Sequence, residues 1–347
     1  MPINNGLAAL SNNLFLWAIV IYAVAMTCYA IEYAFGVRGL VASAAKSQVH
    51  EAAKVPVLIG AGGLDSSLPA DASRAAASPA RSGAAARWGA RAMVLGRAAV
   101  LATVIGALCQ LGSLIARGIS VHRVPWGNMY EFVCVACLVG VTCWLIALSR
   151  RPKLRHLGLF VLLPVVLLLG LAGTVLYAKA APLVPALNSV WLKIHVSAAA
   201  TSSGIFMFGF VCGVLYLIRQ GYDARTVAGR EITFPFTIGV RLPSAESLER
   251  LTFRVHALAF PLWTFAVIAG SIWAEAAWTS YWSWDPKETW AFISWVVYAA
   301  YLHARATAGW RGKKAVAIVI LGWGTMMVNL FVINLVQTGL HSYAGVS

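Results

Sequence analysis

Long apolar stretches constrain this chain more than any other feature. Crossing about 30 Å of hydrocarbon takes about 20 helical residues. Eight stretches satisfy this requirement, near residues 14–35, 97–117, 129–148, 156–178, 196–218, 255–274, 288–304 and 315–337. Only 11% of the residues are charged, against about 25% in a soluble domain. The sequence therefore predicts an all-α integral membrane protein with about eight transmembrane helices.

The distribution of positive charge predicts the orientation. Of 27 Lys and Arg residues, 22 fall in alternate connections, at 36–97, 149–155, 219–254 and 304–314. Positive charge is retained in the cytoplasm, so these connections are expected there and both termini outside. The net charge of +15 is then mostly a topology signal, and no nucleic-acid partner is expected. We expect a multi-pass protein of the plasma (inner) membrane.

Composition divides the chain into three parts. Residues 1–37 predict an N-terminal transmembrane helix. Residues 38–96 predict a cytoplasmic low-complexity loop, because 41–94 are rich in Ala, Ser, Gly and Pro and almost devoid of aromatics. Residues 97–347 predict a seven-helix core that includes a tryptophan-rich segment, 273–295.

The six cysteines all lie in apolar runs, which indicates buried thiols rather than a disulfide framework. Cys134 and Cys137 form C-x-x-C within a predicted membrane helix. Packing is the favoured interpretation there, and redox chemistry is the alternative.

The stretch YWSWDPKETW, residues 281–290, concentrates aromatic and charged residues in an apolar chain. Asp285 as N-cap, Pro286 at the first helical position and Glu288 at the third predict a helix start with a capping box. Six of the fourteen tryptophans lie between 273 and 295. Trp278 and Trp282, four residues apart, are expected to share a helix face. Two interpretations stay open, an interfacial belt and a platform for a flat apolar ligand.

Three of the seven histidines are candidate iron ligands. His195 and His341 fall at the predicted outer surface, level with the tryptophans, and neutral imidazole is a usual haem ligand. They form either a bis-histidine iron site or two unrelated interfacial histidines. His303, near the cytoplasmic end of 288–304, is either a functional intramembrane residue or a snorkelling one. His256 is a weaker candidate at that level.

Four segments together resemble the cytochrome c assembly (WWD-domain) family, in its CcsA/ResC branch, called CcsB in some bacteria, of System II cytochrome c biogenesis. They are WxxYWSWDPKETWAFISWVVYAAYLHAR from Trp278, PWGNMYEF at 125–132, KIHVSAAA at 193–200 and LHSYAG at 340–345. The resemblance covers roughly 115–347. One departure is Thr279, where a glycine commonly follows the tryptophan. A β-branched residue predicts that the backbone has no positive φ there.

The resemblance implies that haem b passes from the cytoplasmic side to the outer surface, where His195 and His341 hold the iron. The haem vinyl groups there meet the C-x-x-C-H thiols of apocytochrome c. It also implies His303 as a ligand on the entry path, opposite a ligand from a ResB-like subunit. The chain would be one component of haem attachment in a two-protein complex. Other expected haem-binding residues are Trp278, Trp282, Trp284, Asp285 and Trp290, with Lys287, Glu288, Asn128, Tyr130 and Glu131 as further candidates.

Two other functional classes remain open. A secondary transporter of another amphipathic metabolite would need polar groups near the midplane. The candidates for these are Asn334, Gln337 and the Ser/Thr cluster at 201–203. A scaffold that only anchors a partner is the other class. A visible absorption spectrum of the purified protein separates both from haem handling.

Overall fold

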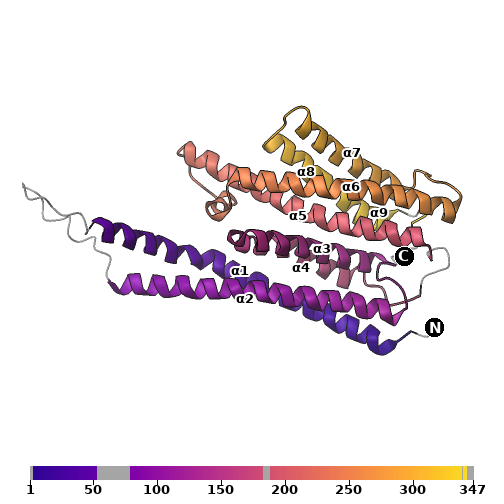
Figure 1. Ribbon diagram of the computed structural model, residues 1–347, viewed down its shortest axis with the longest axis horizontal. Helices are drawn as coiled ribbons and strands as arrows, with labels where there is room; N and C mark the ends of the chain where they lie inside the picture. The colour runs from indigo at the N-terminus through magenta and orange to yellow at the C-terminus, as the bar shows by residue number, and fades with distance from the viewer. Residues whose placement is uncertain (1–2, 53–78, 183–187, 338, 342–347) are drawn as a thin grey trace, which may run out of the picture.

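The computed structural model describes residues 3–52, 79–182, 188–337 and 339–341. Within them the regular structure is entirely helical, and Figure 1 shows long helices packed side by side. The helices are α1 (Asn5–Ala52), α2 (Pro79–Ser120), α3 (Met129–Arg150), α4 (Gly158–Thr174), α5 (Val190–Val227), α6 (Ala245–Trp278), α7 (Pro286–Ala306), α8 (Lys313–Met327) and α9 (Ile333–Val336). Short 3₁₀ segments span Pro152–Leu157 and Phe236–Arg241, and a π-helical segment, Val328–Val332, joins α8 to α9.

Among the described residues, seven helical segments are long and apolar enough to cross a membrane. They correspond to seven of the eight predicted spans, so the prediction of an all-α multi-pass membrane protein is confirmed. The eighth predicted span, 288–304, is α7, a helix of 21 residues that packs against α8. Its ends carry Lys287, Glu288, His303 and Arg305, which lower its apolarity below that of the other seven.

The helices extend beyond the predicted spans. The backbone of α1 is helical through Ala52, and α2 begins at Pro79, so the predicted loop 38–96 is helical at both of its ends. Residues 53–78 of that loop lie outside the described residues. Alanine, abundant on both sides, has the highest helix propensity, and this favours helix where low hydropathy alone suggested a loop. The predicted connection 219–254 likewise contains the C-terminal end of α5 and the first turns of α6.

The helices form two groups with α3 between them. In the first group α2 and α4 pack on α1, and in the second α5 packs on α6 and α8, with α7 beside α8 (Figure 1). Polar side chains bridge helices inside the bundle, as is usual in membranes. Tyr22 Oη donates to Gln110 Oε1 at 2.8 Å, and Gln110 Nε2 donates to the Cys134 carbonyl at 2.8 Å. Cys134 and Cys137 are buried free thiols in this packing.

The two ends of the bundle differ in character. The backbone N–H of Asn4 donates to the Ser120 carbonyl at 3.0 Å, so α1 begins where α2 ends. At this same end α3 and α5 begin, α6 ends and α7 begins (Figure 1). We call it the pocket end. The opposite, or far, end carries the basic connections 149–155, 219–254 and 304–314.

The backbone at Thr279 corrects one prediction. Thr279 caps the C-terminus of α6 with φ 58° and ψ 25°, which is the left-handed conformation, so the expected absence of a positive φ is wrong. Its N–H donates to the Glu275 carbonyl at 2.8 Å, as in a left-handed helix cap. The geometry of the cap, rather than side-chain preference, sets φ here.

Replacing Thr279 with glycine is expected to stabilise the protein. A left-handed conformation costs an L residue about 1–2 kcal/mol, and glycine removes most of that cost. We expect a higher thermal unfolding midpoint for the detergent-solubilised Thr279→Gly protein. Thr307 ends α7 with φ −101°, where glycine relieves nothing, so Thr307→Gly is the matched control and should not raise the midpoint. Equal shifts in both variants would contradict the strain at Thr279.

Candidate functional site

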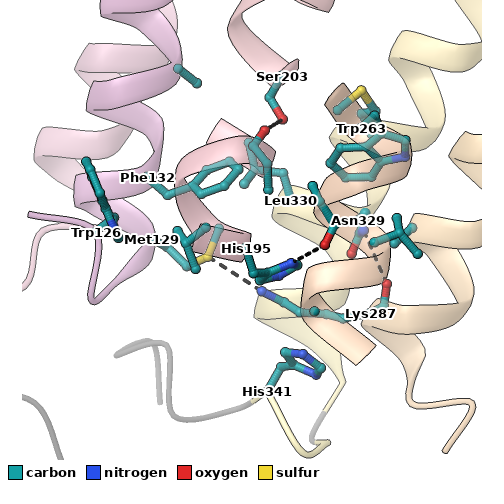
Figure 2. A pocket seen from close by; sticks show the side chains of 18 of the residues that line it. Trp126, Met129, Phe132, His195, Ser203, Trp263, Lys287, Asn329, Leu330 and His341 are labelled. Atoms are coloured by element: carbon teal, nitrogen blue, oxygen red, sulfur yellow. Dashed lines mark hydrogen bonds between the residues drawn. The ribbon is translucent and has the colours of Figure 1, made fainter. Parts of the chain in front are cut away.

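A cavity of about 210 Å³ lies among α3, α5, α6, α7 and α8 and reaches the pocket end. We call it the pocket. Six indoles line it, from the two helices α6 and α8 and from two loops: Trp126, Trp263, Trp273, Trp278, Trp282 and Trp323. His195, His341, Lys287, Asn128, Ser203 and Asn329 contribute polar groups to its wall. Figure 2 shows several of these side chains from close by.

His195 lies near the start of α5, which Ser189 caps by accepting from the Trp191 N–H at 3.2 Å. Its Nδ1 lies 2.7 Å from the carbonyl oxygen of Ala266 on α6 (Figure 2). Because a carbonyl only accepts, Nδ1 carries the hydrogen, and Nε2 keeps the lone pair that an iron ligand requires. The bond to α6 thus fixes both the tautomer and the orientation of the ring.

His341 follows α9 and reaches the same pocket. Its Nδ1 donates to Asp285 Oδ2 at 2.8 Å, and its ring makes edge contacts with Trp278 and Trp273 at centroid distances of 4.9 and 6.1 Å. The Leu340 N–H donates to Asp285 Oδ1 at 2.7 Å, so one carboxylate holds two consecutive residues. Metal-binding histidines commonly donate their second ring nitrogen to such a carboxylate.

Asp285 also begins α7. Its side chain accepts from the Lys287 N–H at 3.2 Å, and Glu288 Oε2 accepts from the Asp285 N–H at 3.3 Å, which confirms the predicted capping box. Burial raises the pKa of Asp285, but the hydrogen bonds from His341 and from the Leu340 N–H outweigh it. The pKa therefore lies below its usual value, and the carboxylate is ionised at neutral pH.

Lys287 places a cation inside this aromatic pocket. Its Nζ lies 3.5 Å from Met129 Sδ, a weak acceptor (Figure 2). Within the described residues no carboxylate lies within ion-pair distance of it, because Asp285 and Glu288 are engaged in the helix cap and with His341. The arrangement favours a ligand that brings its own negative charge.

The pocket wall contains flexible side chains as well as rigid rings. Met129, Met207, Met326 and Met327 line it, and unbranched thioether side chains repack readily around a ligand. The π-helical segment after α8 brings Asn329 and Leu330 to the wall, where Asn329 Nδ2 donates to the Lys287 carbonyl at 3.3 Å.

The segment PWGNMYEF forms one side of the pocket through a buried charge cluster. Glu131 is fully buried and pairs with Arg117 at 2.6 Å and with Arg123 at 2.7 Å, and it accepts from the Gly127 N–H at 2.7 Å. Asn128 caps α3 by accepting from the Glu131 N–H at 2.9 Å. Of the three candidates in this segment, Asn128 lines the pocket, whereas Glu131 and Tyr130 lie buried behind it.

Other predicted residues lie elsewhere. Trp282 does not share a helix face with Trp278, because α6 ends at Trp278 and Trp282 lies in the following loop, yet both line the pocket. Trp284, which is 64% exposed, and Trp290 are not among the lining residues. His303 is exposed near the far end of α7, and His256 is buried in α6 outside the pocket.

Sequence reasoning missed much of the α6 wall. Ala266, Gly270 and Ala274 recur every four residues next to Trp263, and all four line the pocket. That stripe of small residues beside an indole is a helical pattern that could have indicated it. Gly270 is essential to the wall, because a Cβ there would lie 2.6 Å from His195 Nδ1.

Replacing Gly270 with alanine is expected to displace the His195 ring and break its bond to Ala266. The substitution changes neither His195 nor α5, the helix that carries it. Loss of an orienting contact typically weakens binding about 10–100-fold, and we expect the lower end of this range, a fall of about tenfold in ligand affinity. The matched control is Gly324→Ala, since a Cβ at Gly324 meets nothing within 4 Å. Binding is measured on purified protein by titration with haem. Equal affinity in the two variants would show that Gly270 does not position His195.

The fold and the site together define a multi-pass membrane protein with an indole-lined pocket that holds two imidazoles at one end of its helical bundle. The family model described as cytochrome C assembly protein matches residues 126–341, and the chain belongs to this family. Proteins named cytochrome c biogenesis protein CcsA from Gloeobacter violaceus, Pyropia yezoensis and Guillardia theta are 33%, 34% and 35% identical to it. The alignments cover 71%, 70% and 70% of this chain and 86%, 86% and 84% of the respective relatives.

The match confirms the resemblance predicted from the motifs. The protein is a membrane-embedded component of cytochrome c assembly of the CcsA type, and this role entails the handling of haem.

Proposed function

We propose that the protein carries haem b to the outer surface of the plasma (inner) membrane and presents it there for attachment to apocytochrome c. His195 and His341 would be the two axial ligands of the iron. The observation that carries this proposal is their meeting in one indole-lined pocket from distant parts of the chain, each with Nδ1 engaged by a protein acceptor. This leaves Nε2 as the ligand atom on each ring.

The remaining groups of the pocket suit the rest of the haem molecule. The indoles offer apolar faces to the macrocycle. Lys287, whose Nζ forms no ion pair within 4.0 Å in the described part of the chain, would pair with a haem propionate. The indole N–H groups of Trp126, Trp263 and Trp282 are buried without an acceptor in the described part of the chain. Buried donors of this kind call for a partner, which oxygen atoms of a ligand would supply.

The distribution of basic residues supports an outward orientation of the pocket. The basic connections lie at the far end of the bundle, so the positive-inside rule directs the pocket end outward. There a ResB-like partner subunit would bring apocytochrome c, and each cysteine S–H would add across a haem vinyl group. The reactivity belongs to haem and thiol, whereas the chain contributes orientation and exclusion of water. His303 would bind haem on its way in.

The alternative of a transporter for another amphipathic metabolite has less support. Ser202 and Ser203 donate to the Ala199 carbonyl of their own helix, and Asn334 Nδ2 donates to the Leu330 carbonyl. These polar groups therefore donate to backbone carbonyls three or four residues earlier in the chain, which leaves them less available to line a polar path across the bilayer.

The test is the visible spectrum of the protein purified after co-expression with a ResB-like partner and a haem supply. A Soret band with the features of bis-histidine haem is expected. Its absence when haem and partner are both present would overturn the proposal in favour of a transporter or a scaffold.

A further inference from the structure

Four aromatic rings close the bundle core below the pocket. Phe206 and Tyr298 stack with centroids 3.9 Å apart and ring planes 3° from parallel. His256 contacts both rings at 5.5 Å and Tyr301 at 5.4 Å. We call these four residues the ring plug. It links α5, α6 and α7, and none of its members is more than 1% exposed.

The ring plug is buried and closely packed. A Cβ at Gly209 would lie 2.4 Å from His256 Cε1, so the imidazole packs directly against the backbone of α5 at this point. His256 Nε2 and Tyr298 Oη are buried without a partner among the described residues. Met207, next to Phe206 in the sequence, lines the pocket, whereas no plug residue does. The lining of the pocket therefore does not include the ring plug.

His303 lies on the other side of this barrier and on the outside of the bundle. Its side chain is exposed, and it is not part of the pocket. One face of α7 carries Phe292, Val296, Ala299 and His303, because these residues are spaced four, three and four positions apart. Phe292 is 39% and Val296 is 43% exposed. Figure 1 shows α7 at the edge of the bundle.

This face of α7 continues into the pocket through aromatic contacts. Phe292 stacks on Trp295 with planes 7° apart and makes edge contacts with Trp282 and Trp284 at 6.4 and 6.1 Å. Trp282 is itself a lining residue of the pocket. The exposed face of α7 and the rings it contacts thus form a continuous apolar surface, which we call the α7 track. It consists of Phe292, Val296, Ala299, His303, Trp295 and Trp282. From His303 to Phe292 it is about 16 Å long at 1.5 Å per residue.

We infer that haem travels from His303 to the pocket along the α7 track, on the outer face of the bundle, rather than through its core. The inference rests on the proposed function. A flat macrocycle lies well against exposed aromatic and small aliphatic side chains. The track joins the two candidate histidine sites without opening the ring plug, and it enters the pocket beside Trp282.

The test places a charge on the track. Val296→Asp is compared with Leu321→Asp on α8, where Leu321 is 59% exposed. Val296 lies ten residues from the far end of α7, and Leu321 lies eight residues from the far end of α8. An aspartate at either position therefore has a similar free-energy cost of insertion into the membrane. Each is made in the intact chain and in the His195→Ala/His341→Ala background, with the partner co-expressed. Haem per protein is measured in both backgrounds, and the difference between them is the haem held in the pocket.

We expect Val296→Asp to lower pocket haem at least fivefold while haem in the double-alanine background stays unchanged, and Leu321→Asp to change neither. If the two aspartate variants hold equal amounts of haem in the pocket, the proposed route along the α7 track is wrong. Loss of haem from the double-alanine background in Val296→Asp would also overturn it, because the track acts after His303. If Val296→Asp does not accumulate, Val296→Asn and Leu321→Asn repeat the comparison. Absence of histidine-dependent haem in the unsubstituted protein would instead refute the proposed function.

Discussion

Purified His195→Ala protein is expected to retain at least tenfold less haem in the pocket than the unsubstituted protein. Losing an orienting contact of a metal ligand already costs about 10–100-fold, and here the ligand itself is removed. The helix should persist, because the ring makes one hydrogen bond, to Ala266, and lies at the pocket wall. Added imidazole should restore part of the binding by occupying the vacated position.

The comparison has a matched control and a companion variant. His122 lies at the same end of the bundle, is exposed and does not line the pocket. Its φ of 54° favours asparagine over alanine as the replacement, so His122→Asn is the control and should leave haem unchanged. Trp282→Ala removes one indole and should also lower bound haem. Unchanged haem in both His195→Ala and Trp282→Ala would defeat the assignment of the pocket.

The fold was predictable because the membrane imposes simple rules. Apolar length determines the spans, and the described helices correspond to them. Helix ends were not predictable by the same rule. Residues 36–52 and 79–96 continue as helix because alanine-rich backbone satisfies its own hydrogen bonds without apolar side chains. Thr279 was mispredicted because a local preference lost to the requirements of a helix cap.

The site was predictable only in part. The capping box at Asp285 is local in sequence, and spacing alone reveals it. His195 and His341 were candidates because both fall at the predicted outer surface, level with the tryptophans, and neutral imidazole is a usual haem ligand. The contact between His195 and Ala266 depends on how α5 packs on α6, and nothing local in the sequence records it. Trp126 and Trp323 reach the pocket through the same kind of long-range packing.

Asp285→Ala is expected to have the second largest effect, because one carboxylate has three roles. It orients His341, holds the Leu340 N–H and caps α7. Haem retention should fall about 10–100-fold, as for the loss of a carboxylate that orients a metal-binding histidine. The lost cap should in addition lower the free energy of unfolding by about 1 kcal/mol. Haem content and thermal unfolding of the purified variant measure the two effects separately.

Asp285→Asn separates orientation from capping. Asparagine is as good an N-cap as aspartate, so the stability should stay near that of the unsubstituted protein, while a neutral amide is a weaker acceptor for His341 and haem retention should still fall. Because the pKa of Asp285 is lowered, its contribution is complete above the ordinary value of about 3.9 and is lost only as the pH falls through the lower folded-state pKa. The contribution of Asp285 to haem retention should therefore stay constant from neutrality down to about pH 5. Asp223→Asn, in an ion pair with Arg219 remote from the pocket, is the control. If Asp285→Asn binds haem as tightly as this control, Asp285 only caps α7, and His341 needs no anionic partner to face the pocket.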